Sequence, residues 1–404
     1  MKKVQSLICC LLAMTLFLSC GSSRNSGLDS PLWSVRMAES EMIRNPSLWM
    51  ADFVTEKKWN YTQGLMGLAF LKLYDVTDDK RYFDYAKGYA DSLIDADGII
   101  YKYRMDNYNL DQVNPGKMMF ILYDKTGDPR YEKVIQTLYR QLQNQPRTDE
   151  GGFWHKKIYP DQMWLDGLYM GAPFYAEYAL RYNHPDDFRD AVNQFLIIAS
   201  RTYDPVTGLY RHAFDASKKM AWADSITGQA PHAWGRAMGW FSMAIVDVLD
   251  FLPVDQPGRN ELTGILQGMV QKLSEIQDPA TGGWYQVPDQ SGAEGNYIET
   301  SCTAMFAYSI FKGVRMGYLD KKYLAVAGKA YQGLLDNFIV TNPDGTVSMK
   351  NICGVAGLGG DPYRDGSYEY YIGELIRDND PKGVGPFILA SLEYEMIPGK
   401  SNKK

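Results

Sequence analysis

Six long segments of the chain are rich in apolar residues that recur with helical periodicity. Each opens with small residues, often glycine, and continues as an almost uninterrupted apolar run. A helix that is apolar on all sides is buried, so these segments predict six interior helices. They cover residues 62–77, 114–128, 165–182, 235–252, 300–317 and 384–395.

Five of these segments are followed by a second helix, which contains both apolar and charged residues. The connections "DVTDDKR" and "KTGDPR" indicate the end of one helix and the N-cap of the next. Glycine-plus-aromatic stretches such as "GGFWHKK" and "TGLYRHA" then predict short strands or turns at one end of the structure. The second helices cover residues 80–94, 129–143, 185–203, 258–276 and 321–339.

Six helical hairpins in succession predict an all-α protein, an (α/α)6 barrel with short strands or turns at one face. An open solenoid of helix pairs is the alternative. The irregular unit lengths and the lack of polar capping repeats favour a closed ring. We expect residues 31–404 to form this single catalytic domain.

The N-terminal stretch predicts export. Two lysines precede an apolar run over residues 7–18, which is too short for a comfortable membrane span, and "LFLSC" is followed by "GSSRNSG". We interpret residues 1–19 as a lipoprotein signal peptide, Cys20 as the lipidated residue and residues 20–30 as a flexible tether. An ordinary secretory signal is the alternative. Both interpretations place the protein outside the cytoplasm, and we expect a cell-envelope lipoprotein that faces the periplasm.

Composition narrows the function classes. The net charge of −6 and the pI near 5.4 argue against a nucleic-acid partner. The 29 tyrosines and 9 tryptophans exceed the needs of a helical core, and such flat rings cover the apolar faces of sugars, although packing is the alternative. No histidine pair has a metal-binding spacing and no Cys/His cluster occurs, so no metal or cofactor is expected. Cys302 and Cys353 either pair or stay buried as thiols.

The residues just before the inner helices are expected to meet in one funnel, because these helices begin at the same face. Asp111 and Asp166 then face one aromatic-lined cavity, and glycosidic chemistry commonly uses two carboxylates. Asp166 lies in "MWLDGLYM", where Trp164 and its apolar neighbours disfavour a charged carboxylate. The alternative is that both aspartates are N-caps. Other funnel candidates are Trp59, Asn60, Tyr61, Asn114, His155, Lys156, His212, His232, Trp234, Glu299 and Thr300.

Arg236 lies in "WGRAMGW", between Trp234 and Trp240. An arginine held by aromatic walls is suited to bind a substrate carboxylate through a charge-assisted contact. The alternative is a structural bridge from Arg236 to Asp111 or Asp224.

The segments "QMWLDGLYMGAPF", "LDQVNPGK", "GGFWHKKIYPDQ" and "WGRAMGW" together resemble glycoside hydrolase family 105, the unsaturated rhamnogalacturonyl hydrolases. The resemblance runs from Trp59 to the C-terminus, and the family has the (α/α)6 barrel. It implies an enzyme that hydrates the 4,5 double bond of an unsaturated galacturonate in lyase-generated rhamnogalacturonan (pectin) oligosaccharides. An acid delivers a proton to C4, water adds at C5, and the hemiketal opens and releases the neighbouring sugar, usually rhamnose.

The resemblance also implies roles for individual residues. Asp166 would be the proton donor and water activator. Asp111 would hold sugar hydroxyls and help to position the water. The substrate contacts implied are Tyr61, His155, Lys156, Trp164, His212, Trp234, Arg236 and Trp240.

Three other functions stay open at this point. An unsaturated glucuronyl hydrolase acting on glycosaminoglycan products would favour more basic residues than the predicted loops contain, since Lys156, Lys157, Arg211 and Arg236 are almost the whole set. A non-catalytic glycan-binding lipoprotein would not need Asp166 among apolar rings. An isomerase or epimerase on the same barrel would need histidines on both sides of the sugar. In all cases the expected partners are sugars, with membrane contact only through the lipid anchor.

Overall fold

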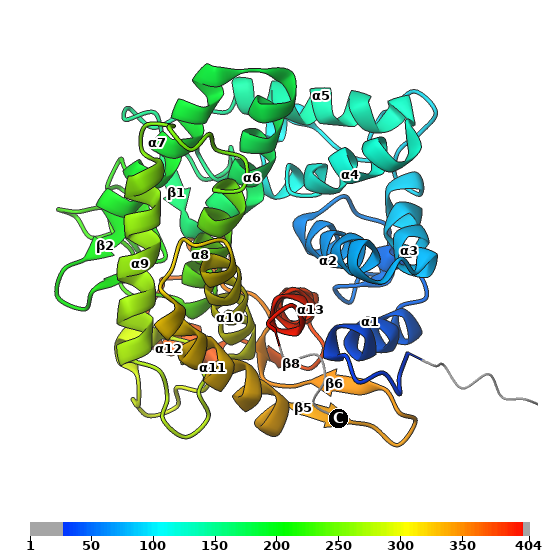
Figure 1. Ribbon diagram of the computed structural model, residues 1–404. Helices are drawn as coiled ribbons and strands as arrows, with labels where there is room; N and C mark the ends of the chain where they lie inside the picture. Colours follow the sequence, from blue (N-terminus) through cyan, green and yellow to red (C-terminus); the bar gives the residue numbers. More distant parts are fainter. Residues whose placement is uncertain (1–26, 399–404) are drawn as a thin grey trace, which may run out of the picture.

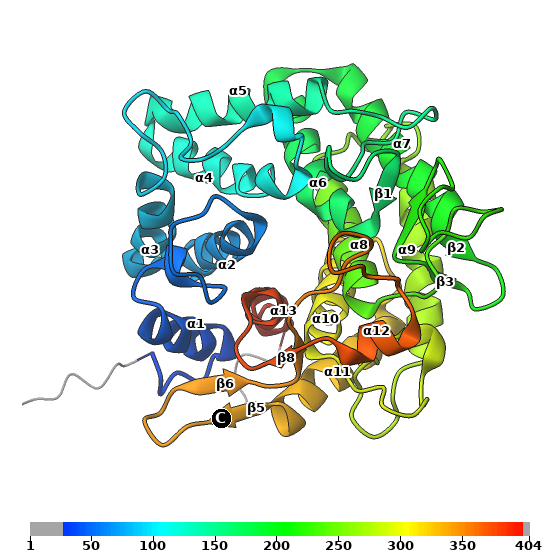
Figure 2. The same ribbon diagram turned by 180° about the vertical axis from the view of Figure 1, so that it is seen from behind.

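The computed structural model describes residues 27–398, which form a closed ring of helices (Figure 1). Each inner helix contacts the next, from α2 through α4, α6, α8 and α10 to α13, and α13 contacts α2 again. Figure 2 shows the ring from its other end. The (α/α)6 barrel predicted from the sequence is therefore confirmed. The signal peptide, Cys20 and most of the tether lie outside the described residues.

The helices and strands have the following bounds. The inner helices are α2 (Tyr61–Thr77), α4 (Gly116–Thr126), α6 (Leu165–Tyr182), α8 (Gly235–Val248), α10 (Thr300–Arg315) and α13 (Pro381–Glu395). The outer helices are α1 (Trp33–Arg44), α3 (Lys80–Asp91), α5 (Pro129–Gln143), α7 (Pro185–Thr202), α9 (Arg259–Glu275) and α11 (Leu324–Asn337). The short helix α12 is Tyr368–Gly373. The strands are β1 (Gln162–Trp164), β2 (Tyr203–Asp204), β3 (Leu209–Tyr210), β4 (Ala213–Asp215), β5 (Ile339–Thr341), β6 (Val347–Met349), β7 (Ile352–Cys353) and β8 (Ile376–Arg377).

The inner helices are buried on all sides, as their composition predicts. Every residue of α8 is buried, and so is α10 from Thr300 to Gly313. Their surfaces are covered by neighbouring inner helices on two sides and by an outer helix on the third. Although these helices are apolar, none within residues 27–398 is long and apolar enough to cross a membrane.

The small residues at the start of the inner helices allow the helices to approach closely. A Cβ added at Gly235 would lie 2.9 Å from the Tyr285 carbonyl oxygen and 2.9 Å from Cys302 Sγ. A Cβ added at Gly385 of α13 would lie 2.9 Å from Leu65 of α2. Real side chains almost never make such short contacts, so glycine is required where these helices meet.

The sixth outer helix comes from the N-terminal side of the chain, which the sequence pattern did not predict. Helix α1 packs on α13 and supplies the outer partner that α13 lacks after it. Ser34 Oγ donates a hydrogen bond of 2.6 Å to Glu395, and Arg44 donates one of 2.7 Å to the carbonyl oxygen of Val347. The ring is thus closed by contacts between segments about 300 residues apart.

The strands form small antiparallel pairs: β1 with β4, β2 with β3, β5 with β6, and β7 with β8. The stretch "TGLYRHA" forms β3 and the start of β4, whereas "DGIIYKY", "GGFWHKK" and "GGWYQVP" each contribute an isolated bridge, so the prediction of short strands or turns is confirmed. The two cysteines predicted to pair or stay as thiols, Cys302 in α10 and Cys353 in β7, are both buried and free.

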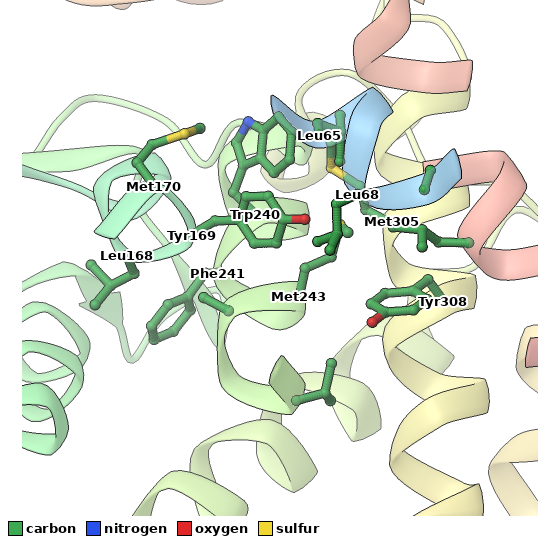
Figure 3. Packing of buried hydrophobic residues seen from close by; sticks show 14 of the residues in the cluster. Leu65, Leu68, Leu168, Tyr169, Met170, Trp240, Phe241, Met243, Met305 and Tyr308 are labelled. Carbon is green, nitrogen blue, oxygen red and sulfur yellow. The ribbon is translucent and has the colours of Figure 1, made fainter. Parts of the chain in front are cut away.

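Aromatic rings fill the centre of the barrel between its two ends. Trp240 stacks on Tyr169 with ring centroids 4.8 Å apart, and the edge of Tyr61 meets Trp240 at 6.2 Å. Figure 3 shows Trp240 over Tyr169, with Leu65, Leu68 and Met305 beside them. These rings lie between a mouth, where the inner helices begin, and a second end, where they finish.

The second end contains a cavity of about 470 Å³, which we call the rear cavity. All six inner helices contribute to its lining. Its polar lining residues include Lys117, Glu177, Asp247, Tyr308, Lys312 and Glu393. Each of these six side chains is largely buried.

Glu177 in the rear cavity makes stability depend on pH. Burial raises the pKa of Glu177 to about 7, although Arg181 at 2.8 Å opposes this effect. The folded state therefore binds more protons than the unfolded state between about pH 4.5 and 7, so the free energy of unfolding falls as pH rises through this window. This rise of the Glu177 pKa from 4.5 to about 7 corresponds to a loss of at most about 3 kcal/mol in the free energy of unfolding.

We expect Glu177→Gln to remove this loss. The free energy of unfolding of the variant, measured relative to that of the original protein, should rise by about 1–3 kcal/mol between pH 5 and pH 8. Above pH 8 the difference between the two proteins should stay constant. Urea unfolding at several pH values measures the difference. Glu261→Gln on the exposed face of α9 is the control, and its difference from the original protein should not change with pH. If the unfolding free energies of Glu177→Gln and the original protein instead run parallel with pH, Glu177 is not the group that makes stability depend on pH.

Candidate active site

The mouth of the barrel collects the residues that precede the inner helices. Asp111 lies in a 3₁₀ turn (Leu110–Gln112) before α4, and Asp166 is the second residue of α6. Strand β1, which leads into α6, pairs with β4 so that Trp164 is opposite Ala213. The Leu165 N–H donates a hydrogen bond of 3.1 Å to the carbonyl oxygen of His212. This ladder places His212 next to Asp166.

Neither aspartate caps its helix, so the alternative interpretation as N-caps is wrong. The N-cap of α6 is Trp164, whose side chain makes no capping bond. At the turn before α4, the side chain of Asn109 accepts a hydrogen bond from the Asp111 N–H. Neither carboxylate is therefore used as a helix cap.

Asp111 is held as an anion by a half-buried cationic partner. Lys156 Nζ lies 2.6 Å from Asp111 Oδ2, and His155 Nε2 lies 3.4 Å from Oδ1. Burial alone would raise the pKa of Asp111, but Lys156 and His155 outweigh burial and lower it. Asp111 therefore stays ionised throughout the neutral range.

His155 is a neutral ring between the two acids. Burial lowers the pKa of His155 to about 4, although Asp111 and Asp166 both favour its charged form. The ring lies parallel to Trp164, with centroids 4.9 Å apart and an interplanar angle of 4°. Its Nδ1 is buried and has no hydrogen-bond partner within residues 27–398. His155 therefore offers a neutral donor or acceptor at the mouth.

Asp166 and His212 approach each other without forming a hydrogen bond. Asp166 Oδ2 lies 3.3 Å from His212 Nε2, yet both buried atoms lack a hydrogen-bond partner among the described residues. A buried polar atom without a partner is costly, and such atoms occur where a ligand or water completes the bonding. The space next to these two atoms is therefore the clearest ligand-binding position in the mouth.

Tyr371 of α12 fixes the orientation of His212. Tyr371 Oη lies 2.7 Å from His212 Nδ1, and both residues are fully buried. Burial raises the pKa of Tyr371 well above 10, so its hydroxyl keeps its proton. This hydroxyl has no other acceptor in the described part of the chain, which favours donation to Nδ1 and the His212 tautomer with its proton on Nε2. Nε2–H then faces Asp166.

Aromatic rings form one wall of the mouth. Trp164 stacks on both His155 and Tyr159, with ring centroids 4.9 Å and 4.8 Å away, and the His155 and Tyr159 rings lie only 6.5 Å apart, so they lie side by side against the indole. Trp234 lies behind His212 at 4.8 Å, and its Nε1 donates a hydrogen bond to Gln286. Trp164 and His155 are buried in this cluster and Tyr159 is its more exposed member, so the Tyr159 ring offers an apolar face of the kind that packs on a sugar ring.

Two of the predicted contact residues lie at the floor of the mouth. Tyr61 is the first residue of α2, and Asp111 contributes to the rise of its pKa well above 10, after burial. Trp240 is 1% exposed and lies beneath Tyr61 in the central aromatic layer. Tyr61 is therefore the nearer of the two to Asp111.

Arg236 is fully buried, and its partner differs from both bridges predicted from the sequence. Its Nε donates a hydrogen bond of 2.6 Å to Ser301 Oγ, and its Nη2 lies 3.4 Å from Glu299 and also bonds the Cys353 carbonyl oxygen. The bridge to Asp111 or Asp224 is not formed. Because α8, α10 and β7 meet at this guanidinium, Arg236 in this structure joins elements and is not part of the exposed lining.

Sequence reasoning missed Tyr371, Tyr159 and Arg364. Tyr371 lies in "SYEYYIGEL", a stretch with several tyrosines and no pattern that distinguishes one from another. Arg364 donates a hydrogen bond of 3.1 Å to Tyr159 Oη and holds the outermost ring of the stack. Only Tyr159 had a signal, because it stands in the same loop as His155 and Lys156. His232, a predicted funnel residue, instead bonds Asp289 at 2.8 Å.

The arrangement can perform acid–base chemistry on a sugar. It has one carboxylate paired with an ammonium, a second beside an oriented imidazole, and a neutral ring between them. An aromatic surface next to these groups can hold the sugar so that one of its carbons faces Asp166.

Comparison with known proteins agrees with this geometry. The sequence model of glycosyl hydrolase family 88 matches residues 33–398. A solved family 105 glycoside hydrolase from C. acetobutylicum ATCC 824 is 45% identical and has a TM-score of 0.86. The match covers 90% of this chain and 99% of that one.

Two sequence relatives add detail. Protein Atu3128 of Agrobacterium fabrum is 37% identical over 237 residues, which are 56% of this chain and 99% of the relative. The unsaturated rhamnogalacturonyl hydrolase YesR of Bacillus subtilis is 25% identical over 307 residues, which are 74% of this chain and 83% of the relative.

Proposed function

Because the chain belongs to glycoside hydrolase family 105 and matches the sequence model of glycosyl hydrolase family 88, we propose that it hydrates the 4,5 double bond of a non-reducing-end unsaturated galacturonate. The neighbouring sugar released is rhamnose, from lyase-generated rhamnogalacturonan oligosaccharides. The observation that carries the proposal is the pair of buried, unpartnered atoms, Asp166 Oδ2 and His212 Nε2, beside an aromatic wall. The name of the B. subtilis relative, an unsaturated rhamnogalacturonyl hydrolase, supports the choice of substrate.

Asp166 performs the proton transfer. Its carboxyl group gives a proton to C4, and the positive charge that develops at C5 is shared with the ring oxygen. Water then adds to C5 and returns a proton to the Asp166 carboxylate. The resulting hemiketal opens, and the hemiacetal left at C1 collapses and releases the neighbouring sugar. One water is consumed and Asp166 is regenerated.

The other mouth residues bind and orient the substrate. Asp111, which stays ionised, accepts hydrogen bonds from sugar hydroxyls and helps to position the water. Lys156 balances the charge of Asp111 and attracts the uronate carboxylate. The Tyr159 ring packs on the apolar face of the sugar ring, and His212 Nε2–H donates toward the reacting end.

An absorbance assay tests the proposed function. Purified protein is mixed with an unsaturated galacturonyl–rhamnose disaccharide made by a rhamnogalacturonan lyase. The ultraviolet absorbance of the conjugated enol-carboxylate should fall while free rhamnose appears in equal amount. Turnover of unsaturated chondroitin disaccharides in place of this substrate would replace the proposal with the glucuronyl hydrolase alternative. Binding of either sugar without turnover would indicate a glycan-binding protein.

We further propose that lipid on Cys20 anchors the enzyme in the cell envelope, facing the periplasm. The support is the sequence alone, since this part of the chain lies outside residues 27–398. Cell fractionation of the full chain tests the anchor: Cys20→Ser should move the protein from the membrane to the soluble fraction. A protein that stays membrane-bound after this change would contradict lipidation at Cys20.

Tyr371→Phe is expected to lower kcat by about 10- to 100-fold. Loss of the hydroxyl leaves His212 Nδ1 without a donor, and an unsatisfied buried group costs about 1–3 kcal/mol. The ¹⁵N spectrum of labelled histidine reports the tautomer directly: Nε2–H in the original protein and a mixture in the variant. Tyr370→Phe removes the neighbouring hydroxyl, which bonds the Gly357 N–H, and serves as the control. If kcat and the His212 tautomer are both unchanged in Tyr371→Phe, the Tyr371 hydroxyl does not orient His212.

A further inference from the structure

The rear cavity is separate from the mouth and is used by no step of the proposed reaction. It lies where the inner helices end, and none of its lining residues belongs to the mouth, where Asp166 begins α6. Trp240, Tyr169, Leu65 and Met305 pack together in the interior of the barrel (Figure 3). Lys72, Asp75 and Arg181 at its rim are exposed, whereas Lys117 at its floor is 4% exposed. The cavity is therefore a second pocket that opens to solvent at the other end of the ring.

Most charges in the rear cavity are balanced in pairs. Lys312 Nζ lies 2.6 Å from Asp247 and 2.7 Å from Asp250. Arg315 Nε lies 2.6 Å from Glu393. Arg181 lies 2.8 Å from Glu177. These pairs join three cations to four carboxylates, so they leave one negative charge in excess at the walls.

Lys117 is the exception, because no carboxylate of residues 27–398 forms a salt bridge with it. Its position is explained by Pro173, which lacks an N–H and leaves the Tyr169 carbonyl without a helical partner. Lys117 Nζ lies 3.4 Å from that carbonyl oxygen and 3.5 Å from the centre of the Tyr169 ring. An amine held by one such contact keeps further hydrogen-bonding capacity, which faces the cavity.

Two floor groups can both donate and accept hydrogen bonds near neutral pH. Burial lowers the pKa of Lys117 to about 7, with Asp247 opposing it, and burial raises the pKa of Glu177 to about 7. Each group is therefore present in both protonation states. A hydroxyl also donates and accepts, so hydroxyls match these groups in either state.

We propose that the rear cavity is a second ligand site, which binds a neutral molecule with several hydroxyl groups, of the size of a mono- or disaccharide. Its volume of about 470 Å³ lies within the range of small-molecule sites. Paired carboxylates and cations chelate neighbouring hydroxyls, and Phe251, Leu389 and Leu392 supply apolar contact for the carbon skeleton.

The surrounding charges disfavour ions of either sign. The inner helices end at this face, so the negative ends of their dipoles join four carboxylates, Glu177, Asp247, Asp250 and Glu393, in opposing an anion. A cation is opposed by the amines and guanidinium groups of Lys117, Lys312, Arg181 and Arg315. A neutral ligand avoids both costs.

Calorimetric titration with D-glucose, which is not a sugar of the proposed substrate, tests the site. Lys117→Met removes the amine from the floor, and Val76→Trp narrows the rim at a residue that is 55% exposed. Lys156→Met at the mouth and Val206→Trp, 91% exposed in the β2–β3 turn, are the matched controls. We expect the Kd for glucose to rise at least tenfold in Lys117→Met and Val76→Trp and to stay unchanged in both controls.

Each other outcome overturns the proposal. If glucose binding is lost in Lys156→Met but unchanged in Lys117→Met and Val76→Trp, the sugar binds at the mouth. Binding of acetate without binding of glucose would make the cavity an anion site. No heat from glucose at tens of millimolar would mean that no such site exists. The titration measures binding alone, so its result does not depend on the reaction proposed for the mouth.

Discussion

Asp166→Asn is expected to lower kcat by at least about 10³-fold while substrate still binds. An amide cannot deliver the proton to C4, and a general acid contributes roughly 10²- to 10⁴-fold to such a step. The amide keeps the size and one acceptor oxygen of the original side chain, so binding to the aromatic wall should change little. The absorbance assay measures kcat, and calorimetry with the unsaturated disaccharide measures Kd.

Asp161→Asn is the matched control for this variant. Asp161 lies five residues before Asp166 and adopts a left-handed backbone with φ of 60°, which asparagine also tolerates. Its variant should keep the original kcat. Near-normal turnover in Asp166→Asn would assign the proton transfer to another residue, and Asp111 would be the next to replace.

Arg236→Met is expected to lower the free energy of unfolding by about 3–5 kcal/mol. Arg236 and Glu299 are both 0% exposed, so removing the cation leaves a buried carboxylate without its partner. Glu299 also accepts hydrogen bonds from the N–H groups of Cys302, at 2.7 Å, and Cys353, at 3.0 Å. Loss of its counter-charge therefore affects both the start of α10 and strand β7. Urea unfolding at constant pH gives the difference.

A double variant separates charge from packing. Arg236→Met with Glu299→Gln should recover about 1 kcal/mol or more of the loss, because glutamine is neutral and still accepts from Cys302. Arg189→Met on the exposed surface of α7 should change stability by less than about 0.5 kcal/mol. If Arg236→Met instead unfolds like the original protein and only raises KM, the arginine binds the substrate carboxylate, as the sequence first indicated.

The two ends of the barrel suggest a division of tasks within one fold. The proposed chemistry takes place at the mouth, where loops and short strands of different lengths meet the starts of the inner helices. The rear is formed by helix ends, whose side chains are held in charge pairs. Because none of the residues that line the rear cavity belongs to the mouth, a change at Lys117 and a change at Lys156 can be studied independently.

The sequence by itself determined the barrel and several residues of its mouth. The six apolar segments must be buried, and their small opening residues are required where helices meet, as Gly235 and Gly385 demonstrate. The stretch "MWLDGLYM" placed Asp166 at the start of an inner helix, and the loop "GGFWHKK" placed His155 and Lys156 beside it. These signals are local, because periodicity and helix-start chemistry act within about twenty residues.

Only the tertiary structure decided the contacts between segments far apart in the chain. Helix α1 closes the ring against α13, Tyr371 reaches His212 across 159 positions, and Arg236 meets Glu299 across 63. Each partner is one of many residues of its type, and no local pattern marks which tyrosine or carboxylate packs against which ring. The orientation of His212, the burial of Arg236 and the position of Lys117 in the rear cavity depend on how helices pack in three dimensions, and that packing is what the local sequence does not specify.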